Sequence, residues 1–196
     1  HNDHSPVEAL RKVFTLFSTL QEHDVLTIAR LGRVQRVPPQ AVLLNQGDEV
    51  TAIYLVLSGE AEVLFTLNGR VQLVGSSRRG ELLGEMSLLL SGQKGASAGV
   101  HSALGMDLLA IELSDLRAEL RQNPALGSRF YKGLACMLSR RSRDQLYSYQ
   151  RASLCLQAEQ EAVDCLDVDQ LGSITRAARH FDWLCRYFQR GEPATP

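Results

Sequence analysis

The chain has few of the residues from which metal and catalytic centres are built. Its 196 residues include four cysteines, which never form a Cys-x-x-Cys pair, and five histidines without ligand spacing to cysteine or carboxylate. We therefore expect no metal site. Because all four cysteines fall in segments that we expect to be helical, we predict reduced thiols in a cytoplasmic protein. No nucleophile stands near a candidate base, so we expect no catalytic residues and no enzyme activity.

An excess of charge of one sign and long apolar runs are also absent. Lys plus Arg number 21 and Asp plus Glu 22, so the balance does not point to nucleic acid or to an anionic membrane. No apolar run is long enough to span a bilayer, and we expect no leader sequence and no membrane contact. The basic run Ser139-Arg140-Arg141-Ser142-Arg143 is expected to be a solvated helix face.

Helical patterns flank a region of alternating pattern. Residues 1–31 predict N-terminal helices, one of them around residues 22–30. Residues 32–113 have short strand patterns separated by glycine turns, without a helix of ordinary length between them. The predicted strands include 53–57 and 60–67, broken at Ser58-Gly59, a hairpin at Asn68-Gly69, and 82–83, 98–102 and 106–113. This spacing excludes a parallel doubly wound sheet and predicts an α+β fold with a jelly-roll-like antiparallel β-roll.

After the sheet the chain is predicted to stay helical. Residues 114–150 contain a short helix from Ser114-Asp115 and a long one from Asn123-Pro124. Residues 151–196 form a C-terminal helical extension. Its last helix, roughly Asp169 to Arg190, carries a narrow apolar stripe of the kind that packs on a partner helix.

Residues 80–100 have the composition of an anion-holding loop followed by a single helical turn. Gly84 and Glu85 supply a tight turn and an acceptor carboxylate, and Lys94 supplies a cation. The small residues Gly95-Ala96-Ser97-Ala98 allow backbone N–H groups to approach a ligand closely. Such a loop suits a phosphate with an attached sugar.

The region from about residue 16 to residue 150 resembles the cyclic nucleotide-binding domain of the catabolite activator protein family, of protein kinase regulatory subunits and of cyclic nucleotide-gated channels. Several segments in the right order carry the resemblance: Leu16-Phe17 with Leu20 and Val25-Leu26, Gln46-Gly47-Asp48, the run from Tyr54 to Val63, and Gly84-Glu85-Met86-Ser87-Leu88. The resemblance implies that residues 80–100 are a phosphate-binding cassette. It also implies that the helices of residues 114–150 serve signalling or dimerisation.

The resemblance implies a ligand, cAMP or cGMP, and a role for the first part of the cassette. Glu85 would accept a hydrogen bond from the ribose 2′-hydroxyl, because a carboxylate is only an acceptor. The N–H groups of Gly84, Met86 and Ser87 would lie near the cyclic phosphate. No cofactor is expected.

The second part of the cassette departs from the family, whose phosphate-binding arginine is absent. In one register Lys94 takes its place, and Gly95, Ala96 and Ser97 follow where small residues and a hydroxyl are expected. In a register one residue longer, its place is Gly95. Lysine keeps the charge but loses the planar fork, so we expect binding to be weaker by about tenfold to a hundredfold.

Two functions are therefore predicted. The first is a non-enzymatic regulatory sensor that binds a cyclic nucleotide or related phosphorylated ligand weakly and signals through its C-terminal helices as a homodimer. The second is a degenerate fold that acts as a ligand-independent dimerisation or protein-interaction module. A winged helix-turn-helix needs more chain and a β wing, and only 46 of the 196 residues follow Gln150, so we expect no nucleic acid to bind this chain.

Overall fold

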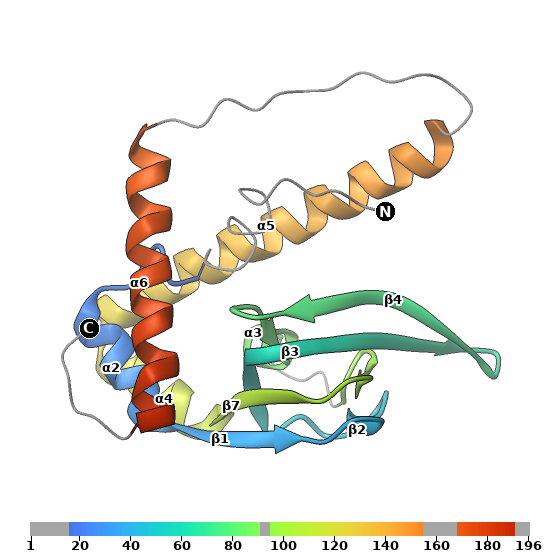
Figure 1. Cartoon of the computed structure of the whole chain (residues 1–196), viewed down its shortest axis with the longest axis horizontal. Coiled ribbons are helices and arrows are strands. Elements are labelled where there is room, and N and C mark those ends of the chain that lie inside the picture. The colour runs from blue at the N-terminus through green and yellow to red at the C-terminus, as the bar shows by residue number, and fades with distance from the viewer. Residues whose placement is uncertain (1–15, 91–94, 155–167, 191–196) are drawn as a thin grey trace.

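The structure is a computed structural model that describes residues 16–90, 95–154 and 168–190. It is an α+β protein with an antiparallel β-roll, as the sequence predicts, and most of its helices gather at one end of the roll (Figure 1). Most of the first predicted N-terminal helix, whose pattern runs to Phe17, falls before residue 16 and outside the described residues, and residues 16–19 form a turn. The elements are α2 (Glu22–Leu31), β1 (Gly32–Val37), β2 (Ala41–Leu44), β3 (Ala52–Leu67), β4 (Arg70–Arg78), β5 (Leu82–Leu83), α3 (Glu85–Leu89), β6 (Gly99–Ser102), β7 (Met106–Glu112), α4 (Leu113–Gln122), α5 (Pro124–Leu154) and α6 (Val168–Arg190).

Strand β3 joins the two halves of the roll. The strand order is β1-β7-β3-β6-β2, with β4 and β5 also paired to β3, and every pairing is antiparallel. The first half of β3 pairs with β7 and β5, and its second half pairs with β6 and β4. One long strand therefore belongs to both layers of the roll.

The predicted break at Ser58-Gly59 is wrong, because β3 continues through it. The register with β7 shifts between Val56 and Ser58, and Gly59 has a φ of 80°. A Cβ at Gly59 would lie 2.4 Å from the carbonyl oxygen of Gly105. Glycine therefore bends the strand at a close backbone contact without ending it.

The apolar core has two parts. The smaller lies within the roll and includes Val56, Ala61, Val100 and Leu108. The larger lies between the roll and the helices, and its fully buried members include Phe17, Leu109, Leu116, Phe130 and Phe181. Helices distant in sequence are thus joined to the roll by one continuous apolar cluster.

The two C-terminal helices differ in how they contact the roll. Helix α5 begins among α2 and α4 and extends beyond them (Figure 1), and the predicted boundary between residues 150 and 151 falls inside it. Helix α6 packs against α2, and its Phe181 ring meets the ring of Phe17, which lies in the turn before α2, edge to face at 5.4 Å. Arg79, just after β4, pairs with Asp182 of α6 at 2.8 Å.

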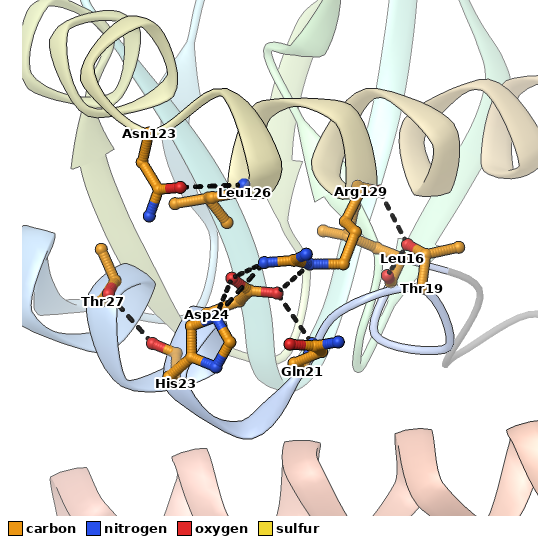
Figure 2. A network of polar contacts seen from close by, with 9 residues as sticks. All are labelled: Leu16, Thr19, Gln21, His23, Asp24, Thr27, Asn123, Leu126 and Arg129. Carbon is orange, nitrogen blue, oxygen red and sulfur yellow. Dashed lines mark hydrogen bonds and ion pairs between the residues drawn. The ribbon is translucent and has the colours of Figure 1, made fainter.

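A buried ion pair fixes α2 to the start of α5 (Figure 2). Asp24 is 1% exposed, and both of its oxygens accept hydrogen bonds from Arg129, at 2.6 and 2.8 Å. The N–H of Gln21 also donates to Asp24, at 2.8 Å. Burial raises the pKa of the Asp24 carboxyl, but the hydrogen bonds from Arg129 and Gln21 outweigh it and hold that pKa below its ordinary value.

The described residues contain neither a membrane-spanning helix nor a metal-binding cluster. No helix in that part of the chain has the length and apolar character needed to cross a bilayer. Nor do three or more His, Cys, Asp or Glu side chains gather there in a way that could hold a metal ion.

Candidate ligand site at helix α3

The first part of the cassette is a turn that brings Glu85 to the start of α3. Strand β5 pairs with the first half of β3, and Gly84 follows it with a φ of 80°. A Cβ at Gly84 would lie 3.0 Å from the carbonyl oxygen of Ala52 on β3. The structure therefore requires glycine at position 84 for two reasons: the backbone is left-handed, and it approaches β3 closely.

Glu85 is a buried carboxylate with a cationic partner. Its side chain is 9% exposed, and Oε1 accepts a hydrogen bond of 2.6 Å from Nη1 of Arg141 on α5. Nη2 of Arg141 donates to the carbonyl oxygen of Leu82 at 2.6 Å and to Oγ of Ser77 at 3.5 Å. One guanidinium thus connects the long helix to the carboxylate and to strands β4 and β5.

This pairing corrects the prediction that residues 139–143 form a solvated face. The side chain of Arg141 is 29% exposed and turned toward the roll. The sequence around Arg141 does not distinguish it from its basic neighbours. The sequence around Glu85 does indicate such a partner, because Glu85 stands among apolar residues and a buried carboxylate needs a cation.

Met86 and Ser87 continue α3 beside Glu85. Met86 is exposed. The N–H of Ser87 donates to the carbonyl oxygen of Gly84 at 3.2 Å, and its own carbonyl accepts a hydrogen bond of 2.5 Å from Arg117 on α4. The turn at α3 is therefore held by side chains from both α4 and α5.

The second part of the cassette lies against the turn between β2 and β3. Lys94 is outside the described residues. The N–H of Ala96 donates to the carbonyl of Asp48 at 2.7 Å, and the N–H of Gly47 donates to the carbonyl of Ala96 at 2.8 Å. Gly95 has a φ of 114°, and a Cβ there would lie 2.7 Å from the Gly47 carbonyl oxygen. The left-handed backbone and this close contact explain the glycine at position 95.

The predicted site residues therefore form two groups. One group is at the start of α3, where Arg141 pairs with Glu85: Gly84, Glu85, Met86 and Ser87. Ala96 and Ser97 instead line a cavity of about 730 Å³, which none of those four residues lines.

Comparison with known proteins identifies the family of the roll. Residues 34–123 match the family described as "Cyclic nucleotide-binding domain". Over 112 residues the chain is 37% identical to a cyclic AMP receptor protein of Thermus thermophilus, covering 56% of this chain and 49% of that protein. It is also 24% identical over 161 residues to a Pycsar effector protein of Xanthomonas perforans, covering 78% of this chain and 52% of that protein. The chain thus spans about half the length of these relatives.

A solved structure agrees in fold. A cyclic nucleotide-binding domain from Methylobacillus flagellatus superimposes with a TM-score of 0.61 at 20% identity, covering 80% of this chain and 88% of that one. The matched residues 34–123 include Glu85 and the whole cassette, whereas Arg141 lies outside them. From the roll, its cassette and these matches together, residues 34–123 are a domain of the cyclic nucleotide-binding family.

Proposed function

We propose that this chain is a non-enzymatic sensor module that binds a cyclic nucleotide, cAMP or cGMP, at α3 and signals through α5. The ion pair between Glu85 and Arg141 is the observation that carries the proposal. It connects the cassette carboxylate directly to the helix that leaves the domain. The likeness to a cyclic AMP receptor protein supports the class of ligand.

Arg141 leaves Glu85 able to bind a sugar. The Arg141 guanidinium donates a hydrogen bond of 2.6 Å to Oε1 of the carboxylate. Since a carboxylate has two oxygens with two lone pairs each, Oε2 can accept the hydrogen bond of a ribose 2′-hydroxyl. Arg141 then orients the carboxylate, and the ligand binds best to the arrangement in which this ion pair is formed.

The ion pair between Glu85 and Arg141 can also transmit ligand binding to α5. A ligand shifts a conformational equilibrium only by its difference in affinity for the two states. A nucleotide held by Glu85 favours the state in which Arg141, and therefore α5, is docked on the roll. Binding at α3 is thus expected to reduce the freedom of α5.

Calorimetric titration with cAMP and cGMP tests the proposal. We expect the wild type to bind at least one of them, and both Glu85→Gln and Arg141→Gln to bind about tenfold to a hundredfold more weakly, because each loses a charged hydrogen bond. Lys94→Arg is expected to bind more tightly than the wild type, because it restores a planar fork for the phosphate. Glu22→Gln, an exposed carboxylate at the start of α2, is the matched control and should bind like the wild type.

Two results would contradict the proposal. Absence of binding by both the wild type and Lys94→Arg would exclude these nucleotides as ligands. Binding by Lys94→Arg alone would instead support the second candidate, a degenerate fold that serves dimerisation or protein interaction. Exposed Leu146 and Tyr147 on the far part of α5 favour self-association in either case, and we propose a homodimer through the C-terminal helices.

A further inference from the structure

Strand β4 is an edge of the roll. It pairs with β3, and no other strand in residues 16–90, 95–154 or 168–190 pairs with it. Figure 1 shows the β3–β4 hairpin extending away from α2, α4 and α6. An edge strand has backbone N–H and C=O groups on one side that no neighbouring strand uses, and a further strand can pair with them. The register with β3 shows which groups of β4 these are.

The backbone groups of Val71 and Leu73 point away from β3, toward the open edge. Thr66 of β3 is opposite Val71, and its N–H donates to Oε1 of Gln46 at 2.7 Å instead of to β4. Opposite residues in an antiparallel ladder exchange either both hydrogen bonds or none, so the N–H and C=O of Val71 also point away from β3. Leu73, opposite Leu64, is two residues further along β4 and has the same orientation.

The part of this edge with regular strand geometry is short. The hairpin turn Asn68-Gly69 precedes it, and both turn residues have positive φ, 52° and 75°. The register with β3 shifts between Leu73 and Gly75, which leaves Val74 as the extra residue of a bulge. Because a bulge interrupts the ladder, the regular part is residues 70–73, here called the edge segment.

The edge segment has exposed apolar side chains. Val71 and Leu73 are each 63% exposed and lie on the same face of β4, because alternate strand residues share a face. Edge strands are commonly protected from pairing with other chains by a charged residue or a proline. Positions 71–73 hold neither. The edge segment is therefore open to pairing both in its backbone and in its side chains.

Arg70 adds a charge at one end of the edge segment. It is exposed, and it has no ion pair with another described residue. Arg78, at the other end of β4, is instead paired with Glu60 at 3.1 Å. Because opposite charges directly across a ladder stabilise the pairing, the strand that fits this edge has a carboxylate opposite Arg70.

A second copy of β4 does not supply that carboxylate. If two copies paired antiparallel about Gln72, Val74 of the second copy would be opposite Arg70. If they paired along the whole strand, Arg78 of the second copy would be opposite Arg70, and like charges directly opposite are destabilising. The charge of the edge segment thus favours a different protein as the partner.

We propose that the edge segment binds an extended segment of a partner protein as an added antiparallel strand. The partner has apolar residues opposite Leu73 and Val71, a polar residue opposite Gln72 and a carboxylate opposite Arg70. Its backbone exchanges both N–H···O hydrogen bonds with Val71 and both with Leu73. Read from its N-terminus, the partner segment therefore has the order apolar, polar, apolar, acidic.

Fluorescence anisotropy of a synthetic peptide tests the proposal. The probe is fluorescein-Ser-Val-Thr-Val-Glu-Ser-amide, whose Val-Thr-Val-Glu core has the proposed order. We expect saturable binding to the full chain. N-methylation of the second valine removes the N–H that donates to the carbonyl of Val71, and should weaken binding at least tenfold. N-methylation of the threonine is the matched control, because that N–H points away from β4, and this peptide should bind like the unmodified probe.

Val71→Pro tests the same hydrogen bonds from the side of the protein. Proline is tolerated on edge strands where the N–H faces outward, so the roll is expected to keep its far-ultraviolet circular dichroism. We expect Val71→Pro to weaken the probe about tenfold, whereas Val71→Thr keeps the N–H and should bind like the wild type. Arg70→Gln should weaken the probe but not a peptide with glutamine in place of its glutamate.

Four results would overturn the proposal: binding that does not saturate, equal binding of the two N-methylated peptides, wild-type affinity in Val71→Pro, or equal weakening of both peptides by Arg70→Gln. A fall in the mass of the chain on addition of the peptide, measured by light scattering, would assign the edge to a second copy and also overturn it. If Val71→Pro does not fold, the two N-methylated peptides decide, because they leave the protein unchanged.

Discussion

Two buried carboxylates, each paired with an arginine of α5, connect that helix to α2 and α3. Asp24 of α2 pairs with Arg129, and Glu85 of α3 pairs with Arg141. A buried carboxylate that loses its cation is strongly destabilising, because its charge is left without water or partner. Through these two residues one helix is bound both to the N-terminal segment and to the candidate site.

Asp24→Asn is expected to lower the free energy of unfolding by roughly 3 kcal/mol at pH 7, because Arg129 loses a buried anionic partner. The pKa of Asp24 lies below its ordinary value of 3.8 in the folded state, so its contribution is present above that value and is lost as pH falls through the folded-state pKa. The difference from the wild type should therefore shrink only in strong acid. Urea denaturation between pH 2 and pH 7 measures it.

Asp107→Asn is the matched control for that series. Asp107 pairs with Arg36 at 3.0 Å, but the arginine side chain is 84% exposed. Exposed ion pairs contribute about 0 to 1 kcal/mol. A loss in Asp107→Asn as large as in Asp24→Asn would show that burial does not set the strength of the α2–α5 pair.

Gly59→Ala is expected to destabilise the chain more than Gly69→Ala. Both glycines have positive φ, 80° and 75°, so both substitutions carry a left-handed strain of about 1–2 kcal/mol. Only at Gly59 would the new Cβ meet backbone, 2.4 Å from the Gly105 carbonyl oxygen, whereas nothing lies within 4 Å at Gly69. We expect an additional loss of about 1–3 kcal/mol for Gly59→Ala, measured by thermal unfolding. Equal losses would contradict a close contact at the bend of β3.

At the scale of elements, local patterns predicted most of the roll but not its long-range pairs. Alternation and glycine turns predicted the hairpin at Asn68-Gly69 and the strands on either side of it, because such signals are local. The bend at Gly59 looked like a strand end, since a glycine that breaks a strand and one that bends it have the same local pattern. Arg141 could not be chosen from its basic neighbours, because its partner Glu85 is 56 residues away.

Helix α6 is held by apolar contact more than by charge. Phe181 is fully buried against Phe17, whereas the side chains of Arg79 and Asp182, which form the ion pair, are 49% and 56% exposed. Trp183, the single tryptophan of the chain, is buried on the same helix. Its fluorescence therefore reports whether α6 is docked.

Phe181→Ala is expected to move the Trp183 emission to longer wavelength at a temperature where the far-ultraviolet circular dichroism of the roll is unchanged. Losing a buried phenylalanine costs about 3–5 kcal/mol, which weakens the apolar contact that docks α6. Asp182→Asn, which breaks only the exposed pair with Arg79, should leave the emission as in the wild type. A red shift in Asp182→Asn alone would contradict an apolar anchor.

At the scale of the whole molecule, α5 is the element whose two ends have different surroundings. Its first part is buried by α2 and α4 and carries Leu126, Phe130 and Leu134 in the core. Its far part extends beyond those helices and exposes Leu146 and Tyr147 (Figure 1). If the far part is free in one copy, a second copy can cover it, and a ligand at Glu85 that restrains α5 then also acts on the dimer.

Light scattering tests this assembly. We expect the wild type to have the mass of a dimer and the double substitution Leu146→Glu with Tyr147→Glu to have the mass of one chain, because two carboxylates replace the apolar contact of a helix pair. Leu104→Glu is the control: Leu104 is 90% exposed in the turn between β6 and β7, so charge there should leave the mass unchanged. A monomeric wild type would exclude the dimer. A dimer that survives both substitutions on α5 would place the contact elsewhere and remove α5 from the route between ligand and partner.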